Sequence, residues 1–444
     1  MPAGFASVRG LNPAAVVAWR AWFGMTPSAR PMSLPVYASV FRALLIVAWG
    51  TYGGLLWFIA RGATLSTRWT WSVAVPVVAL LAFVQPPSLS TDVFAYVGYG
   101  RLAVVHGLNP YLHTQAELVR LGDPTGPYLH WPIPSPYGPL WTLISIAVVF
   151  LAPVGSLLGT TVALKVCAGV AVLAAAAAAR AIARRTDASR ASAVFVAVVL
   201  NPLLLIEGPG NGHNDLVMVA LLLTGFAALA RQRTILAAVL VGLAAAVKLL
   251  PLLVVPWMAV LAVRAAPPSW RHRAGAAMLM LALSIAPVVL AYAPFWSGAR
   301  TLGGVAERWR LGDSSGGTAA DSPPRAAAGN PNERVTRRSR GDTIKAAASF
   351  VLRVASRAWP AVLIYLWASL ALALGRGDAT LRLPILWCCV ALGILFVAGL
   401  WFPWYLAWLW PVVVLRFRRL HTALIVFALP FSLLLVLAYA TPPG

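Results

Sequence analysis

Long apolar runs alternate with short polar connections along most of the chain. Several runs reach the roughly 17 to 25 residues that an α-helix needs to cross a bilayer. The pattern predicts an all-α polytopic membrane protein with about 11 to 13 transmembrane helices, some of them short or re-entrant. The runs lie near residues 37–60, 69–84, 139–153, 158–183, 191–206, 215–230, 234–263, 274–296, 356–374, 383–401, 404–415 and 421–440.

Two of these runs depart from a simple crossing. The run at 234–263 is too long for one span and contains Lys248 and Pro251, so it predicts two helices that meet there. The run at 139–153 is bounded by proline and glycine. We expect it to form a short re-entrant or juxtamembrane helix, because a full crossing there would conflict with the orientation that the arginines indicate.

Arginine clusters recur between the apolar runs and predict cytoplasmic loops. The loops at 207–215, 297–345 and 401–404 are then expected on the opposite side of the membrane. Pro and Arg interrupt the N-terminal segment, residues 1–36, which predicts no cleavable signal peptide, and its own orientation stays open. The clusters are Arg180, Arg184, Arg185 and Arg190, then Arg231 and Arg233, then Arg264, Arg271 and Arg273, then Arg376 and Arg382, then Arg416, Arg418 and Arg419.

The charge of the chain suits a membrane partner rather than a nucleic acid. The net charge is +23, and 60% of the residues are hydrophobic. The basic residues form short clusters between apolar runs, which is the distribution expected beside anionic lipid headgroups, so membrane lipids are predicted as partners and nucleic acid is not. The cysteines, Cys167, Cys388 and Cys389, lie in apolar runs and show no metal-ligand spacing.

Residues 37–444 are expected to form one transmembrane domain. Residues 85–139 form its first large outer loop, and residues 297–345 form another. Within the latter, residues 312–340 are an insertion rich in Gly, Ser, Ala, Pro and Arg without apolar periodicity. Such a segment is predicted to be mobile, because it buries too little surface to offset the entropy of ordering it.

Polar residues concentrate in the first outer loop, and Asp92 is the foremost of them. A carboxylate where a lipid surface meets water is costly unless it is used, so Asp92 is the first catalytic candidate. The alternative is an ordinary first-turn acid of a helix capped by Ser90 or Thr91. The side chains that follow on the same helix favour a functional role, namely Tyr96, Tyr99 and Arg101.

A second polar cluster begins at Glu207, where three glycines and a proline interrupt two apolar runs. Irregular backbone at membrane depth is tolerated where it lines a cavity. His213, Asn214 and Asp215 follow directly, where the next helix starts, and could bind a sugar or phosphate. The alternative is that they only cap that helix.

Lys248 and an aromatic cluster complete the candidates. Lys248 is an isolated ammonium in an apolar run, which either reaches back to the interface or binds a phosphate. The aromatic side chains surround Pro403 and suit a membrane belt, a sugar ring or a polyprenyl chain. They are Trp401, Trp404, Tyr405, Trp408 and Trp410.

Several motifs together carry a family resemblance. The segments STDVFAYVGYGRLAVVHGLNPY, SPYGPLW, GNGHNDLVMVALLLTGF, AAAVKLLPLL and FPWYLAWLWP, from about residue 85 onward, resemble the polyprenyl-phosphomannose-dependent mannosyltransferases of actinobacteria. These enzymes belong to the integral-membrane GT-C glycosyltransferase superfamily. The most specific parts are the Asp92 helix, the turn at Asn109–Tyr111, Tyr137–Pro139 and Gly212–Asp215.

The resemblance implies a GT-C-type bundle that transfers mannose from a polyprenyl phosphomannose donor to a lipid-anchored mannoside on the extracytoplasmic face. It implies an α-(1→6) linkage formed with inversion, and Asp92 matches the general base. Arg101, Lys248 and His213 would stabilise the leaving phosphate. No metal or other cofactor is expected. Other residues expected to contact substrate are Tyr96, Tyr137, Glu207, Asn214, Asp215, Trp404 and Tyr405.

Two other functions stay open. The same architecture could use another polyprenyl-phosphate sugar, such as arabinofuranose. A lipid-linked sugar transporter or flippase would also contain broken helices and intramembrane cations. The sequence shows no internal repeat between its halves, and its outer polar residues cluster on one side, which favours the enzyme.

Overall fold

The computed structural model describes two parts of the chain. The first comprises residues 34–307 except 64, 88–89, 91, 127–128, 130 and 153–155, and the second comprises residues 383–384, 386–388, 390–391 and 403–416. The expected spans at 356–374 and 421–440, the insertion at 312–340, Trp401 and Thr91 lie outside the described residues.

Helices account for nearly all regular structure in the described part, and it contains no β-strand. Four helices are long and apolar enough to cross a membrane, which confirms the expected all-α polytopic class. They are α2 (Leu34–Ala60), α3 (Thr67–Val84), α7 (Leu157–Thr186) and α13 (Trp270–Tyr292, which continues as a 3-10 turn to Phe295).

A bent pair of apolar segments forms either a fifth, broken span or a re-entrant loop. Its first part consists of η3 (Ala188–Arg190) and α8 (Ala191–Val199). Its second part consists of α9 (Pro202–Leu205) and the π-helical turn η4 (Ile206–Gly210), and the bend between the two is 48°. Asn201 caps the second part by accepting a hydrogen bond from the Leu204 amide at 3.1 Å. The glycines and proline after Glu207 therefore mark irregular backbone, as the sequence predicted.

Shorter helices complete the arrangement. The long run divides at Lys248 as predicted, because α11 (Thr234–Val247) ends there and the chain resumes as η5 (Leu250–Val254) and α12 (Val255–Ala265). The helix α6 (Pro139–Leu151) has 13 residues. At 1.5 Å per residue it spans about 20 Å, short of the about 30 Å hydrocarbon core. The others are α4 (Asp92–Val104), α5 (Ala116–Arg120), α10 (Asp215–Leu229), η7 (Arg300–Leu302), η9 (Pro403–Trp408) and α18 (Trp410–Arg416).

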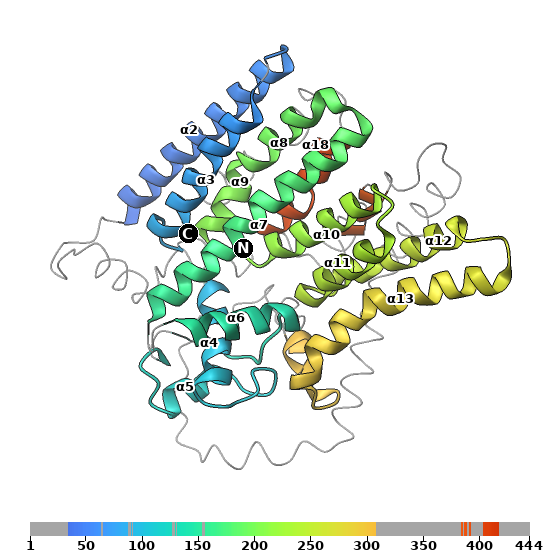
Figure 1. Cartoon of the computed structure of the whole chain (residues 1–444). Coiled ribbons are helices and arrows are strands. Elements are labelled where there is room, and N and C mark those ends of the chain that lie inside the picture. The colour runs from blue at the N-terminus through green and yellow to red at the C-terminus, as the bar shows by residue number, and fades with distance from the viewer. Residues whose placement is uncertain are drawn as a thin grey trace.

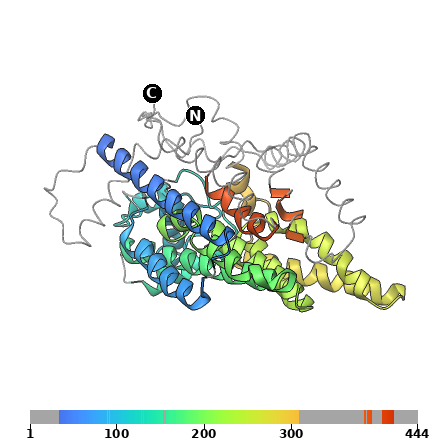
Figure 2. The ribbon, with the colours of Figure 1, turned by 90° about the horizontal axis from the view of Figure 1, so that it is seen from above.

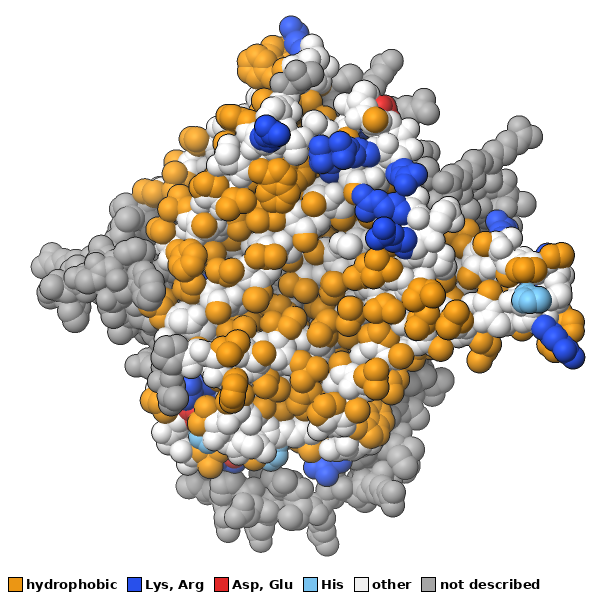
Figure 3. Space-filling view, viewed as in Figure 1, with side chains coloured by type: hydrophobic (Ala, Val, Ile, Leu, Met, Phe, Trp, Pro, Cys, Tyr) orange, Lys and Arg blue, Asp and Glu red, His pale blue; other side chains and the backbone are white. Residues whose placement is uncertain are grey.

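The helix α7 lies in the middle of the described helices, against α3, α8 and α10 (Figure 1). Ser156 caps its start by accepting from the Gly159 amide at 3.0 Å. Arg184 and Arg185 occupy its last turn, where cations complement the helix dipole. Figure 3 shows Lys and Arg side chains gathered at the end of the molecule where α7 finishes, above a broad apolar surface.

The helices α4, α5 and α6 lie together at the opposite end of the bundle (Figure 1). The pair α12 and α13 extends away from the other described helices (Figure 2). Close packing of α11 on α13 depends on Gly242, where an added Cβ would lie 2.4 Å from the Ser284 carbonyl oxygen. The polar connections that enter α4 and α10 meet between these groups of helices and form the candidate site.

Candidate active site

Asp92 is the first residue of α4 and faces the turn before α10. Its backbone N–H donates to the Ser90 hydroxyl at 3.1 Å, so the first N–H of α4 is satisfied by a side chain other than its own. The Asp92 carboxylate is thus not needed as the cap. Its Oδ2 lies 3.7 Å from Nδ1 of His213, and 12% of the Asp92 side chain remains exposed.

His213 stands between two carboxylates. Its Nε2 lies 3.3 Å from Oε2 of Glu207, and the Asn211 amide donates to the same oxygen at 3.0 Å. The side chains of His213 and Glu207 are fully buried. Asp92, His213 and Glu207 therefore lie in a row, called here the carboxylate–imidazole chain, in which the ring nitrogens face the carboxylates without hydrogen-bond geometry and only Asp92 is partly exposed.

The local backbone explains why Glu207 and His213 are neighbours. Glu207 belongs to the π-helical turn, and its carbonyl oxygen accepts from the His213 N–H at 3.0 Å. Gly212 closes the turn with a φ of 77°, a left-handed conformation that favours glycine. Burial opposes a charge on His213, but the adjacent carboxylate of Glu207 and the charges of Asp92 and Asp215 raise its pKa.

Asp215 begins α10 and binds a cation from the end of α11. Lys248 Nζ lies 2.6 Å from Asp215 Oδ1, and the Trp408 indole N–H donates to the same oxygen at 2.6 Å. The ammonium also lies 4.9 Å from the ring centroid of Tyr405. Lys248 is therefore held in an ion pair, while 21% of its side chain stays exposed.

Asn214, unlike Asp215, has no side-chain atom in an ion pair or hydrogen bond among the described residues. It is fully buried, and neither Nδ2 nor Oδ1 has a hydrogen-bond partner within the described part of the chain. The same holds for Oδ2 of Asp215. A buried amide without partners is expensive, so these atoms are available to a bound polar group.

Aromatic side chains cover this polar cluster. Trp404 stacks on the His213 imidazole with a centroid distance of 4.3 Å and an interplanar angle of 18°. On the other side, Tyr96 follows Asp92 by one turn of α4 and packs edge-on against Tyr137 at 4.7 Å. The structure thus brings together residues of α4, the turn before α10, the end of α11 and η9.

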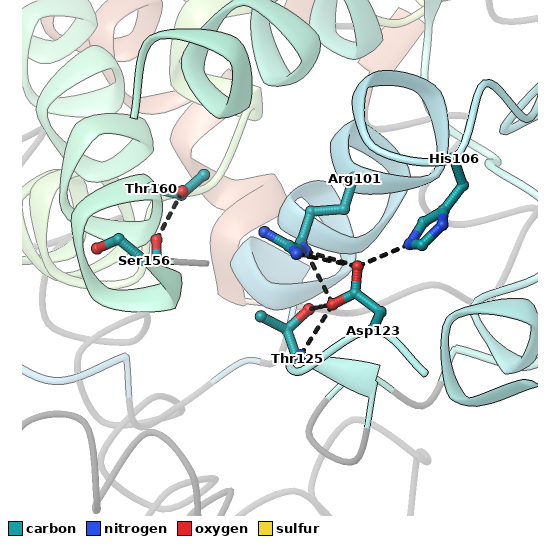
Figure 4. A network of polar contacts seen from close by, with 6 residues as sticks. All are labelled: Arg101, His106, Asp123, Thr125, Ser156 and Thr160. Carbon is teal, nitrogen blue, oxygen red and sulfur yellow. Dashed lines mark hydrogen bonds and ion pairs between the residues drawn. The ribbon is translucent and has the colours of Figure 1, made fainter. Parts of the chain in front are cut away.

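Arg101 lies apart from this group. It is nine residues beyond Asp92 on α4, about 13 Å along the helix axis. Its Nε donates to both carboxylate oxygens of Asp123 at 3.0 Å, and His106 and Thr125 bond the same carboxylate (Figure 4). Its guanidinium is occupied by a buried partner, so the structure does not bring Arg101 to Asp92.

The Asp123 cluster was not anticipated as a unit. Burial opposes ionisation of Asp123, but hydrogen bonds from Arg101, Thr125 and His106 outweigh it and lower the pKa to about 2. A sequence signal exists, because Asp followed two residues later by Thr favours a side-chain-capped turn. Gln115 was also missed; fully buried, it donates to the Ala95 carbonyl at 2.8 Å and joins the outer loop to α4.

The sequence profile of the α-(1→6)-mannopyranosyltransferase family, N-terminal domain, matches residues 3–264, more than half of the chain. The chain belongs to this family. The matched range includes Asp92, Glu207, His213–Asp215 and Lys248, and it stops before Trp404. The carboxylate–imidazole chain and the Asp215–Lys248 pair are therefore both within the family domain.

Two relatives were found among characterised proteins. The chain is 32% identical over 181 residues to α-(1→6)-mannopyranosyltransferase A of Mycobacterium tuberculosis, over 39% of this chain and 34% of that protein. It is 28% identical over 142 residues to α-(1→6)-mannopyranosyltransferase B of Corynebacterium glutamicum, over 31% of this chain and 23% of that protein. The matches thus span about a third or less of these relatives. No solved structure matches the chain.

Proposed function

We propose that this family member transfers mannose from polyprenyl phosphomannose to a lipid-anchored mannoside on the extracytoplasmic face of the membrane, forming an α-(1→6) linkage. The observation that carries the proposal is the unequal exposure along the carboxylate–imidazole chain. Asp92 keeps 12% of its side chain exposed, whereas His213 and Glu207 are fully buried. Asp92 is therefore the member that an acceptor hydroxyl can reach.

The proposed reaction is a single displacement. Asp92 takes the proton of the acceptor hydroxyl as the hydroxyl oxygen bonds to the anomeric carbon. The bond from that carbon to the phosphate oxygen breaks, and its electron pair leaves with polyprenyl phosphate. Attack from the face opposite the leaving group converts a β-linked donor into an α-linked product.

His213 has a supporting role in this mechanism. Its imidazole lies between the two carboxylates, with Nδ1 facing Asp92 at 3.7 Å and Nε2 facing Glu207 at 3.3 Å. This arrangement orients the Asp92 carboxylate toward the acceptor, as a buried carboxylate orients the histidine of a hydrolase triad.

Lys248 suits the leaving phosphate. An ammonium has three donors, and the ion pair with Asp215 Oδ1 engages the group from one side. Because its side chain is partly exposed, it can approach an anion without leaving Asp215. A fixed cation where negative charge develops stabilises the transition state without reorganisation.

Asn214 and the aromatic residues suit the sugar and its lipid. The Asn214 side chain is fully buried, so it meets a sugar only once the site opens; its amide then offers two donors and an acceptor carbonyl, which match adjacent sugar hydroxyls. Trp404 stacks on His213, and Tyr405 contacts Trp404 and lies under the Lys248 ammonium. Both provide apolar faces for a sugar ring or a polyprenyl chain.

The activity is tested with purified protein in nanodiscs, radiolabelled polyprenyl phosphomannose and a lipid mannoside acceptor. We expect label in the acceptor, in a linkage that an α-(1→6)-specific mannosidase removes. If label were transferred only from a polyprenyl-phosphate arabinofuranose donor, the donor sugar would be arabinofuranose and not mannose. If the donor crossed a proteoliposome membrane without any mannose transfer, the protein would be a transporter and not a mannosyltransferase.

The proposed face of the membrane has its own test. Arg120 lies on the surface of α5, at the end of the bundle that holds α4 and α6, and Arg185 lies in the last turn of α7 at the opposite end. A cysteine at position 120 should react with an impermeant thiol reagent added to intact cells, and a cysteine at 185 should react only after lysis. The reverse labelling would place the site in the cytoplasm.

A further inference from the structure

Lys165 is a charged residue in the middle of the long helix α7, and it is fully buried. A buried ammonium in a membrane protein is costly and is retained where it has a use. Its Nζ donates to the carbonyl oxygen of Leu81 at 3.1 Å and to that of Gln85. Both acceptors belong to the last turn and the C-cap of α3.

This contact holds the segment that leads to Asp92. The helix α3 ends at Val84, and its terminal carbonyls carry the negative end of the helix dipole. A cation there stabilises the helix end at that position. The chain continues from Gln85 directly to the start of α4, so Lys165 determines where this connection begins.

The same side chain also contacts the turn that carries His213. A Cβ added at Gly212 would lie 3.2 Å from Lys165 Cγ and 3.1 Å from Val93 Cγ2. Gly212 immediately precedes His213, and Val93 immediately follows Asp92. The Gln85 side chain also approaches this turn, because a Cβ at Gly210 would lie 2.8 Å from its Nε2.

We infer that Lys165 is a positioning residue that sets the distance between Asp92 and His213. Its ammonium fixes the end of α3, and its aliphatic stem packs with Val93 against Gly212. Lys165 touches neither proposed substrate; it acts through the two backbone segments. Its effect on turnover rests on the proposed function, whereas its effect on the backbone does not.

The kinetic test uses Lys165→Met, which keeps the stem and removes the charge, and Lys165→Arg, which keeps the charge. We expect Lys165→Met to lower kcat about 10- to 100-fold with little change in KM for the donor, as a misplaced catalytic group does. Lys165→Arg should recover most of the loss. Thr161→Ala, one turn earlier on α7, removes only a hydroxyl bond to the Leu157 carbonyl and should keep parental kcat.

A double-mutant cycle separates positioning from a general loss of stability. In a His213→Ala background, Lys165→Met should cause little further loss of kcat, because the group that it positions is already gone. If the loss of kcat in the double mutant equalled the product of the losses in the two single mutants, the inference would be overturned. Equal kcat for Lys165→Met and the parent would also overturn it.

Hydrogen exchange provides a readout that needs no activity. The amides of Asn211, Gly212 and His213 donate to Ile206, Gly208 and Glu207 at 2.8, 2.7 and 3.0 Å. Lys165→Met should accelerate their exchange and leave α13 unchanged, while Thr161→Ala should not. Unchanged protection would overturn the inference even if the protein transfers no mannose. Should Lys165→Met aggregate, Lys165→Gln takes its place with the same expected and contrary results.

Discussion

The Asp92 carboxylate and the His213 imidazole face each other at 3.7 Å, although more than a hundred residues separate them in the chain. One lies at the start of α4, and the other lies in the turn between the broken span and α10. Their meeting defines the site, because it joins a partly exposed carboxylate to a fully buried histidine and, through it, to Glu207.

Asp92→Asn should abolish most transfer while preserving the fold. The Ser90 contact uses the backbone N–H of residue 92, which asparagine retains. Loss of a positioned general base should lower kcat at least about 100-fold. The measurement is turnover of monodisperse protein with saturating donor and acceptor.

The matched control for Asp92→Asn is Glu117→Gln. Glu117 is an acid of the same outer loop that pairs with Arg120 on the surface at 3.1 Å. It should keep parental turnover. If Asp92→Asn also kept near-parental turnover, the base would have to be another carboxylate, and Glu207 and Asp215 would be the next to test.

Asn214→Leu should separate stability from activity. The substitution replaces a buried amide that has no partner among the described residues by an apolar side chain of similar volume. Removing an unsatisfied polar group is neutral or stabilising, so thermal stability should hold or rise. The kcat/KM for the donor should fall by a factor that corresponds to about 1 to 3 kcal/mol. A loss of stability with unchanged kcat/KM would show that Asn214 is structural.

Gly138→Ala should destabilise the protein strongly. The Gly138 N–H donates to the Val247 carbonyl at 3.1 Å, and an added Cβ would lie 2.3 Å from the Ala246 carbonyl oxygen. The backbone of Ala246 cannot move aside locally. The added methyl group should therefore lower the free energy of unfolding by about 1 to 3 kcal/mol or more. Gly275→Ala is the control, since a Cβ there meets nothing within 4 Å on α13. Its effect on the melting temperature should be small or favourable.

The Asp123 cluster predicts a pH dependence of stability. Its folded-state pKa is lowered to about 2, so its contribution is present above the ordinary value of 3.8 and is lost as pH falls through about 2. Asp123→Asn leaves buried Arg101 without its carboxylate and should lower the free energy of unfolding by about 3 kcal/mol near pH 7.

The comparison of parent and Asp123→Asn across pH makes this prediction specific. The difference in melting temperature should be constant from neutral pH to about pH 4 and should shrink toward pH 2, as the parental carboxylate takes up its proton. Circular dichroism in detergent measures it. A difference that already disappears near pH 6 would mean that a group other than Asp123 controls the cluster.

Much of the helix arrangement could be predicted from local sequence. Span length depends on runs of apolar residues, and interruptions depend on glycine, proline and charge, all of which are readable along the chain. The break after Glu207 and the division at Lys248 were therefore predictable. The proximity of His213, Asn214 and Asp215 to a broken helix was predictable for the same reason.

Only the tertiary structure decided which side chains meet. Arg101 shares a helix with Asp92, yet it binds Asp123, because packing of the outer loop buries that carboxylate beside it. Lys165 lies within an apolar run and belongs to no sequence motif, but helix packing brings its ammonium to the end of α3. Sequence periodicity identifies what a helix buries, whereas contacts between distant residues depend on how the helices pack against one another.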